Sequence, residues 1–390
     1  MSQIPLTKLP EGEYAERLAR VRARMAERGA EIGLAYANEF VPGDVQYLTG
    51  YDPQIEAVAA VVTPEGVALL GGPEGEAMFN DQDALGSWFN FELFEVPFQD
   101  YGTLRFSSLD DVFAGLGVAK PDHVLLLTDT KYVPHALVEH FSSYGASIDP
   151  GQDILAECRY AKTPLELQLF TEASRIATQA TSAMLDALRP GMTELQLAAV
   201  GDATCKGEGA YSYGWDTMVL SGPRIDSIIG RSSNKAIEEG ELVLVGACPR
   251  YAGYASTVGR TVVAGKPTTE QVRFLEAGAR ALELAAQHLV AGGPAREVDL
   301  APRAFLEEQG LGAFHAYGVG HGIGFSECLE LRTATRSSDY TLQPGISMSL
   351  DVGIFRNPSG YNGRFEDPYI IGHDGTTQRL TDLPVLMTDG

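Results

Sequence analysis

One histidine of this sequence stands in a setting that favours acid–base chemistry. His321 lies in the glycine-rich segment Gly318–Phe325 (GVGHGIGF), and an unperturbed imidazole titrates near neutral pH. We therefore take His321 as the leading candidate for moving a proton. A cysteine–histidine nucleophilic pair with Cys248 or Cys328 is an alternative, although a lone cysteine is more often a small buried apolar residue.

Other side chains are suited to holding a substrate. Arg260 and Arg332 could each bind a carboxylate through two parallel hydrogen bonds, although ion pairing within the protein is the commoner use of an arginine. Tyr213 and Trp215 belong to the aromatic run YSYGW, which either lines a pocket or packs in the core. We expect a substrate-binding group made of Arg260, Arg332, Tyr213, Trp215 and Cys328.

Composition excludes several classes of function. The chain has 390 residues, 29 basic and 52 acidic side chains and a net charge of −23, which argues against binding nucleic acid. No apolar run approaches the roughly 20 residues of a membrane helix. No signal peptide is recognisable, so we expect a cytoplasmic protein. The four cysteines form no C-x-x-C pair, so neither a structural zinc site nor a disulfide framework is expected.

The first part of the chain alternates predicted strands with helices. An amphipathic helix over Tyr14–Met25 is followed by β-rich segments at 32–37, 45–51, 57–62, 67–70 and 123–128, and by a helix over 133–144. This order predicts a small α/β domain over residues 1–155.

Three helix starts mark the second part, residues 156–390. Thr163 with Glu166, Thr193 with Gln196 and Thr268 with Gln271 form capping boxes. We expect helices at about 164–188, 194–208, 269–291 and 296–310. Strands are expected near 216–221, 241–247, 254–264, 346–355 and 364–371. Helices followed by returning hairpins indicate an α+β domain, with the helices on one face of an antiparallel sheet.

The hairpin within residues 238–265 carries the pattern GYAS-x-x-GRT, which resembles the pita-bread (M24-type) hydrolases: methionine aminopeptidase, aminopeptidase P, prolidase and creatinase. Five further segments occur in that family's order: LRPGMTELQLAA, SGPRID with EEGELVLV, GVGHGIGF, LQPGISMSLDVG and GRFEDPYII. The resemblance covers essentially the whole chain. It implies a small N-terminal domain, a C-terminal pita-bread domain and a homodimer.

The same resemblance assigns five positions to metal ligands. Gly246 and Thr257 stand where the family has two bridging aspartates, and Asp351 stands where it has a glutamate, whereas His321 and Glu366 match. Bridging carboxylates neutralise two closely spaced dications, so we expect no dinuclear centre and take the cofactor as none. The alternative is a single divalent cation at His321, Asp351 and Glu366. A third reading involves no metal: Glu366 pairs with a nearby arginine such as Arg260 or Arg364, and His321 is hydrogen-bonded between them.

Two family histidines are also replaced, by Ile229 and Cys328. Creatinase, the metal-free relative, uses the first of these histidines and an acidic residue where this chain has Gly259, so creatine hydrolysis is not expected. We interpret the protein as a metal-independent hydrolase of a small C–N substrate, with His321, Asp351 and Glu366 as catalytic residues. The alternatives are a non-catalytic ligand-binding protein and an Xaa-Pro peptidase of the prolidase type with at most one metal.

Overall fold

The computed structural model describes residues 9–94, 105–325 and 329–386. The chain divides into two compact units, Met1–Arg159 and Tyr160–Gly390, and each is described by itself; the sequence analysis placed this boundary between residues 155 and 156. The α+β class expected from the sequence is observed. Within the described ranges, no helix is both long and apolar enough to cross a lipid bilayer.

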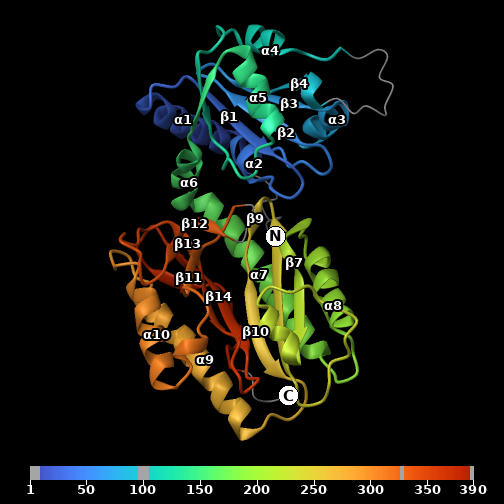
Figure 1. The fold of residues 1–390 in the computed structure, drawn as a ribbon, viewed down its shortest axis with the longest axis vertical. Helices are drawn as coiled ribbons and strands as arrows, with labels where there is room; N and C mark the ends of the chain where they lie inside the picture. The colour runs from blue at the N-terminus through green and yellow to red at the C-terminus, as the bar shows by residue number, and fades with distance from the viewer. Residues whose placement is uncertain (1–8, 95–104, 326–328, 387–390) are drawn as a thin grey trace, which may run out of the picture. The chain divides into compact units, whose positions relative to one another are not determined.

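The first unit is built on a mixed sheet whose described strands run in the order β4-β3-β2-β1-β5-β6 (Figure 1). The β1–β2 and β2–β3 pairs are antiparallel, and the β3–β4, β1–β5 and β5–β6 pairs are parallel. Its strands are β1 (Ile32–Ala37), β2 (Val58–Val62), β3 (Val67–Gly71), β4 (Ser87–Asn90), β5 (His123–Leu126) and β6 (Ser147–Pro150). Its helices are α1 (Glu11–Glu27), α2 (Gly43–Thr49), α3 (Pro73–Asp81), the 3₁₀ turn η1 (Glu92–Phe94), α4 (Leu109–Leu116), α5 (His135–Tyr144) and α6 (Gln152–Tyr160).

One prediction in this unit is wrong. Residues 45–51, expected as a β-rich segment, lie mostly in helix α2, which ends at Thr49. Gly50 follows with φ of 81° and ends the helix in the left-handed conformation that glycine adopts at little cost. The apolar composition of this segment was interpreted as a strand, but a short buried helix has a similar composition.

The second unit contains an antiparallel sheet in the order β12-β11-β13-β14-β10-β8-β7, with β9 added to β8 and β15 to β14 (Figure 1). Its strands are β7 (Ser212–Ser221), β8 (Leu242–Tyr251), β9 (Tyr254–Ala255), β10 (Val258–Val263), β11 (Gly320–Gly322), β12 (Glu330–Ala334), β13 (Ile346–Ile354), β14 (Gly363–Ile371) and β15 (Thr377–Arg379). Its helices are α7 (Pro164–Ala187), α8 (Glu194–Gly207), α9 (Thr269–His288) and α10 (Glu297–Glu308), with 3₁₀ turns η2 (Gly222–Ser227) and η3 (Gly312–Phe314).

The three predicted capping boxes are confirmed. At the start of α7, α8 and α9 a threonine hydroxyl accepts from the backbone N–H three residues later, and that later side chain accepts from the threonine's own N–H. Each box satisfies two backbone groups that a helix terminus otherwise leaves open, which typically stabilises by about 1 kcal/mol. These local signals set the positions of the helices that back the sheet.

The long helices pack on one face of this sheet. A Cβ on Gly278 of α9 would lie 2.0 Å from the Phe365 ring of β14, and a Cβ on Gly201 of α8 would lie 2.9 Å from the Thr217 methyl group of β7. Figure 1 shows α9 and α10 along the β13–β14 half, and α7 and α8 along the half that contains β7. Because side chains alternate along a strand, Glu366, next to Phe365, projects from the opposite face.

Candidate active site

A row of directly paired residues crosses four strands on the face away from the helices. Asp351 of β13 pairs with Glu366 of β14, Glu366 pairs with Gly259 of β10, and Gly259 pairs with Gly246 of β8. Directly opposite residues of an antiparallel pair project to the same side. The sheet register therefore gathers two carboxylates and two bare glycines on one face.

His321 joins this row from β11. The His321 Nε2 lies 3.7 Å from Glu366 Oε1. The His321 Nδ1 lies 3.1 Å from the carbonyl oxygen of Gly322. A carbonyl can only accept, so Nδ1 carries a hydrogen, and Nε2 is the ring nitrogen that faces Glu366.

Asp351 is held by a tyrosine and an arginine. The Tyr317 hydroxyl donates to Asp351 Oδ1 at 3.0 Å, and Arg364 Nε lies 3.4 Å from the same oxygen. Arg364 Nε also donates to the Tyr317 hydroxyl at 3.1 Å. Burial raises the pKa of Asp351 to about 6, with the Arg364 charge opposing this shift and the Glu366 charge adding to it.

Glu366 is ionised more easily than Asp351. Burial alone would raise the pKa of Glu366, but His321, Arg364 and the Ser349 hydroxyl together hold it below its usual value. The Ser349 hydroxyl donates to Glu366 Oε1 at 2.8 Å. Two neighbouring carboxyl groups with pKa values shifted in opposite directions are typical of sites that divide acid and base roles.

His321, Asp351 and Glu366 fit one metal ion. Each offers a ligand atom, and the three atoms lie within 4.8 Å of one another. Metal–ligand bonds of about 2.1 Å place opposite ligands about 4.2 Å apart, so small side-chain movements would complete the coordination. The imidazole and two carboxylates, with water, form a donor set that suits Mn²⁺ or Zn²⁺.

A second metal does not fit beside the first. Gly246 has no side chain, and a Cβ built there would lie 2.9 Å from Cη2 of Trp215. Thr257 offers a neutral hydroxyl that is buried and has no hydrogen-bond partner in the described chain. The two positions that the resemblance gives to bridging carboxylates therefore supply no negative charge, and one is covered by an indole ring.

Arg260, expected to contact substrate, lies in the protein interior. Its side chain is 0% exposed, and it donates five hydrogen bonds, to the carbonyl oxygens of Gly259, Glu366, Leu383 and Pro384 and to Asp367 Oδ1. Arg379 donates to the other oxygen of Asp367 at 2.7 Å. These contacts fasten residues 383–384 to the sheet, so they favour a structural role over the predicted substrate contact.

Replacing Arg260 by methionine is expected to lower the free energy of unfolding by about 3–5 kcal/mol, because it leaves Asp367 and several carbonyl groups buried with fewer partners. Denaturant unfolding followed by circular dichroism measures the loss. Arg296→Met, at an exposed arginine, is the control and should change the unfolding free energy by less than about 0.5 kcal/mol. A loss below 1 kcal/mol for Arg260→Met would contradict the structural role.

The other residues that were predicted to contact substrate are not gathered at one place in the described structure. The Arg332 guanidinium stacks on Tyr160 and Tyr340, with ring centroids 4.4 and 5.1 Å away. Cys328 lies outside the described residues, and Cys248 is buried in β8. The nucleophilic pair of a cysteine with His321 therefore stays a prediction.

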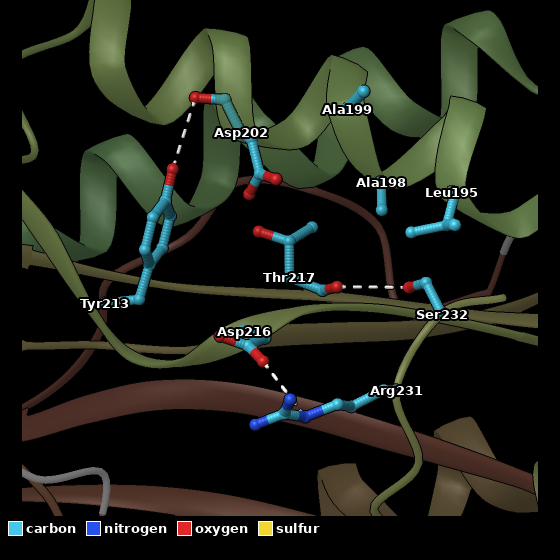
Figure 2. Close-up of a pocket in the computed structure, with 9 residues that line it drawn as sticks. All are labelled: Leu195, Ala198, Ala199, Asp202, Tyr213, Asp216, Thr217, Arg231 and Ser232. Carbon is cyan, nitrogen blue, oxygen red and sulfur yellow. Dashed lines mark hydrogen bonds and ion pairs between the residues drawn. The ribbon is translucent and has the colours of Figure 1, made fainter. Parts of the chain in front are cut away.

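The side chains of Tyr213 and Trp215 lie in different places, although the two residues are only two positions apart. Tyr213 lines a pocket of about 330 Å³ under α8, where its hydroxyl donates to the Asp202 carbonyl at 3.4 Å (Figure 2). Trp215 instead reaches over Gly246. The β7–β8 register shifts between Tyr213 and Trp215 and again before Met218. Such bulges break the regular alternation of side chains and redirect them.

Three residues support the two site carboxylates; no role was predicted for Tyr317 or Ser349, and Arg364 was considered only as a partner of Glu366. Tyr317 and Arg364 hold Asp351, and Ser349 holds Glu366. The strand periodicity carried a signal for two of them, since Ser349 and Arg364 each stand two residues from a site carboxylate and share its face. Tyr317 lies before β11 in no regular element, and no pattern in the residues around it indicates its role.

Comparison with known proteins relates the second unit to peptidases. The sequence profile of metallopeptidase family M24 matches residues 168–373. The chain is 29% identical to an Xaa-Pro dipeptidase of Pyrococcus furiosus over 283 residues, which are 71% of this chain and 78% of that protein. It is 31% identical over 232 residues to an Xaa-Pro dipeptidase of Pyrococcus horikoshii, 59% of this chain and 64% of that protein.

Solved structures share the fold over nearly the whole chain. The prolidase from Pyrococcus horikoshii superposes with a TM-score of 0.80 at 22% identity, covering 95% of this chain and 100% of the prolidase. The X-Pro aminopeptidase from Thermotoga maritima gives a TM-score of 0.80 at 23% identity, with 95% and 98% coverage. The pita-bread fold expected from the sequence is confirmed.

Proposed function

Because the chain belongs to metallopeptidase family M24, we propose that it hydrolyses the C–N bond of a small, dipeptide-like substrate of the Xaa-Pro type. One divalent cation, bound by His321, Asp351 and Glu366, would serve this reaction. The observation that carries the proposal is the convergence of these three ligand atoms within 4.8 Å on the face of the sheet away from the helices. The similarity to Xaa-Pro dipeptidases supports the substrate class.

The surrounding residues prepare the three ligands. The Gly322 carbonyl accepts from His321 Nδ1, so Nε2 is the ring nitrogen that would bind the cation. Ser349 orients Glu366, and Tyr317 and Arg364 orient Asp351. Partners of this kind fix ligand geometry and commonly change metal affinity 10–100-fold. A bound cation would polarise the substrate carbonyl or activate water at this place.

The formal charge of the three ligands favours one bound cation over two. Two carboxylates and a neutral imidazole carry a formal charge of about −2, which balances one dication, and Arg364 adds a positive charge 3.4 Å from Asp351. A second dication beside the first would have no carboxylate of its own, because Gly246 and Thr257 supply none. Uncompensated charge in a buried site is strongly unfavourable.

A metal-independent hydrolase is the second candidate. Asp351 has a pKa of about 6 while the pKa of Glu366 is lowered. Such a pair could donate a proton to the leaving nitrogen and accept one from water without a metal. The Arg364–Asp351 ion pair favours this alternative, since it already provides Asp351 with a positive partner.

Metal titration tests the proposal. Protein freed of metal with a chelator should bind one equivalent of Mn²⁺ per chain in isothermal titration calorimetry, and the loaded protein should cleave alanyl-proline. Two equivalents bound at the site would contradict the single-cation proposal. Cleavage by chelator-treated protein that binds no Mn²⁺ would favour the metal-independent candidate. Neither binding nor cleavage across a panel of dipeptides would favour a non-catalytic ligand-binding protein.

The proposal extends to assembly and location. We take the protein to be a homodimer, as the family resemblance implies, and we keep the cytoplasm as its proposed location. Sedimentation equilibrium distinguishes a dimer from the 41.9 kDa monomer.

A further inference from the structure

A pocket of about 330 Å³ lies between helix α8 and strand β7, which is the strand at one end of the described sheet order (Figure 2). The Thr217 side chain of β7 faces α8, since a Cβ on Gly201 would lie 2.9 Å from its methyl group. The pocket is therefore on the helix-covered face of the sheet, opposite to the His321 cluster. Its apolar wall comes from three side chains of α8: Leu195, Ala198 and Ala199.

The Thr217 hydroxyl is a buried polar group of this pocket. Thr217 is 6% exposed, and no described residue forms a hydrogen bond with its Oγ1. Figure 2 shows this hydroxyl pointing toward Asp202 of α8. The main chain beside it is satisfied, since the Ser232 hydroxyl donates to the Thr217 carbonyl at 3.2 Å and accepts from the Val219 N–H at 2.9 Å. A buried hydroxyl without a partner is costly, so it favours a ligand that forms a hydrogen bond at this place.

Asp202 supplies negative charge to the same pocket. Burial raises the pKa of the Tyr213 hydroxyl, and the Asp202 charge adds to that shift. No arginine, lysine or histidine of the described chain forms an ion pair with the Asp202 carboxylate. Lys206, one helical turn away, instead donates to the carbonyl oxygen of Tyr211. The Asp202 charge is therefore available to a positively charged group of a ligand.

We propose that this pocket binds a small primary ammonium ligand, with its nitrogen between Asp202 and Thr217 and its aliphatic chain against α8. An ammonium group carries one positive charge and three donors. The charge is balanced by Asp202, and one donor reaches the Thr217 hydroxyl. The apolar wall of α8 holds the chain. This inference does not rest on the proposed function, because the pocket and the candidate active site lie on opposite faces of the sheet.

Other classes of ligand fit the pocket less well. A divalent metal ion needs several ligands, and among the described residues three side chains that could share an ion gather only at the candidate active site. An anion would be repelled by Asp202. An ion pair between Asp216 and Arg231 also lines the pocket, with 3.3 Å between Oδ2 and Nε. This pair could receive a second group of the ligand, either an ammonium at Asp216 or a carboxylate at Arg231.

Isothermal titration calorimetry with chelator-treated, full-length protein tests the site. Butylammonium should bind at least about 10-fold more tightly than uncharged butan-1-ol, and this advantage should shrink as the NaCl concentration is raised. Asp202→Asn should remove most of the advantage. Two controls should bind butylammonium as the wild type does: Asp186→Asn, at an exposed aspartate of α7, and Glu366→Gln, in the candidate active site. Equal binding of butylammonium and butan-1-ol would overturn the proposal, and so would binding that is lost in Glu366→Gln but kept in Asp202→Asn.

Variants of Thr217 separate ligand binding from folding. Thr217→Val removes the hydroxyl and keeps the shape of the side chain, so it should weaken butylammonium binding about 3–10-fold, whereas Thr217→Ser should retain most of it. Without ligand, Thr217→Val should unfold at a temperature no lower than the wild type, because the hydroxyl that it removes has no protein partner in the described chain. Unchanged butylammonium binding in Thr217→Val would overturn the proposal.

Two longer probes identify the class of ammonium ligand. Butane-1,4-diammonium should bind more tightly than butylammonium if the second group is an ammonium at Asp216, and Asp216→Asn should remove that gain. The zwitterion 5-aminopentanoate should bind more tightly if the second group is a carboxylate at Arg231, and Arg231→Met should remove that gain. Either gain supports the ammonium site and assigns its ligand to diamines or to amino acids, and no gain with either probe assigns it to monoamines. Binding of all three probes that Asp202→Asn leaves unchanged would overturn the proposal.

Discussion

Replacing His321 by alanine is expected to abolish Mn²⁺ binding and turnover while changing the free energy of unfolding by less than about 1 kcal/mol. The imidazole lies against the Gly322 carbonyl and, at 3.7 Å, against Glu366. Glu366 keeps its hydrogen bond from Ser349 when the ring is lost. The change therefore removes a ligand without leaving the carboxylate unpaired. Loss of affinity should exceed the 10–100-fold typical of residues that only support a ligand.

Calorimetry with Mn²⁺ and thermal unfolding of the same samples measure both quantities. His288→Ala, in the last turn of α9, is the matched control and should leave Mn²⁺ affinity and turnover unchanged. If His321→Ala instead fails to fold, the ring is structural and the functional reading of segment 318–325 is wrong. A folded variant with undiminished activity would equally remove His321 from the chemistry.

Much of the second unit was predictable because its signals are local. Capping boxes placed the starts of α7, α8 and α9, and apolar runs placed β13 and β14 to within one residue of their observed bounds. The grouping of His321, Asp351 and Glu366 came from a resemblance between motifs far apart in the sequence. The register of β13 and β14 explains the pairing of Asp351 with Glu366.

The position of Trp215 could not be read from the sequence. In a regular strand Tyr213 and Trp215 would share a face, and both were assigned to one pocket. Two shifts in the β7–β8 register, one on each side of Trp215, direct the two side chains to different places. No local residue pattern indicates where such shifts occur. The surroundings of Arg260 were not predictable for a related reason: its hydrogen-bond partners at residues 383 and 384 lie more than 120 positions away in the sequence.

Restoring the two missing carboxylates is expected to create a second metal site only when Trp215 is also shortened. Gly246→Asp alone places a side chain where Cη2 of Trp215 lies 2.9 Å from the Cβ position, an overlap that typically costs about 1–3 kcal/mol. The double variant Gly246→Asp, Thr257→Asp should therefore lose stability and bind at most one Mn²⁺ per chain. Adding Trp215→Leu should relieve the overlap and raise the stoichiometry to two.

Elemental analysis and calorimetry count the metal ions, with Trp215→Leu alone as the control that should still bind one. The triple variant could also bind only one Mn²⁺ because the side chain at position 351 is too short to reach the metal. Aspartate is one methylene shorter than the glutamate that the family has at this position. Adding Asp351→Glu then decides the matter. A stoichiometry of one in that quadruple variant would show that Gly246 and Thr257 do not correspond to the family's bridging positions. Two Mn²⁺ ions bound by the double variant would show that the Trp215 side chain moves aside at little cost. The absence of carboxylates at positions 246 and 257 would then be the only reason why the wild-type site lacks a second metal.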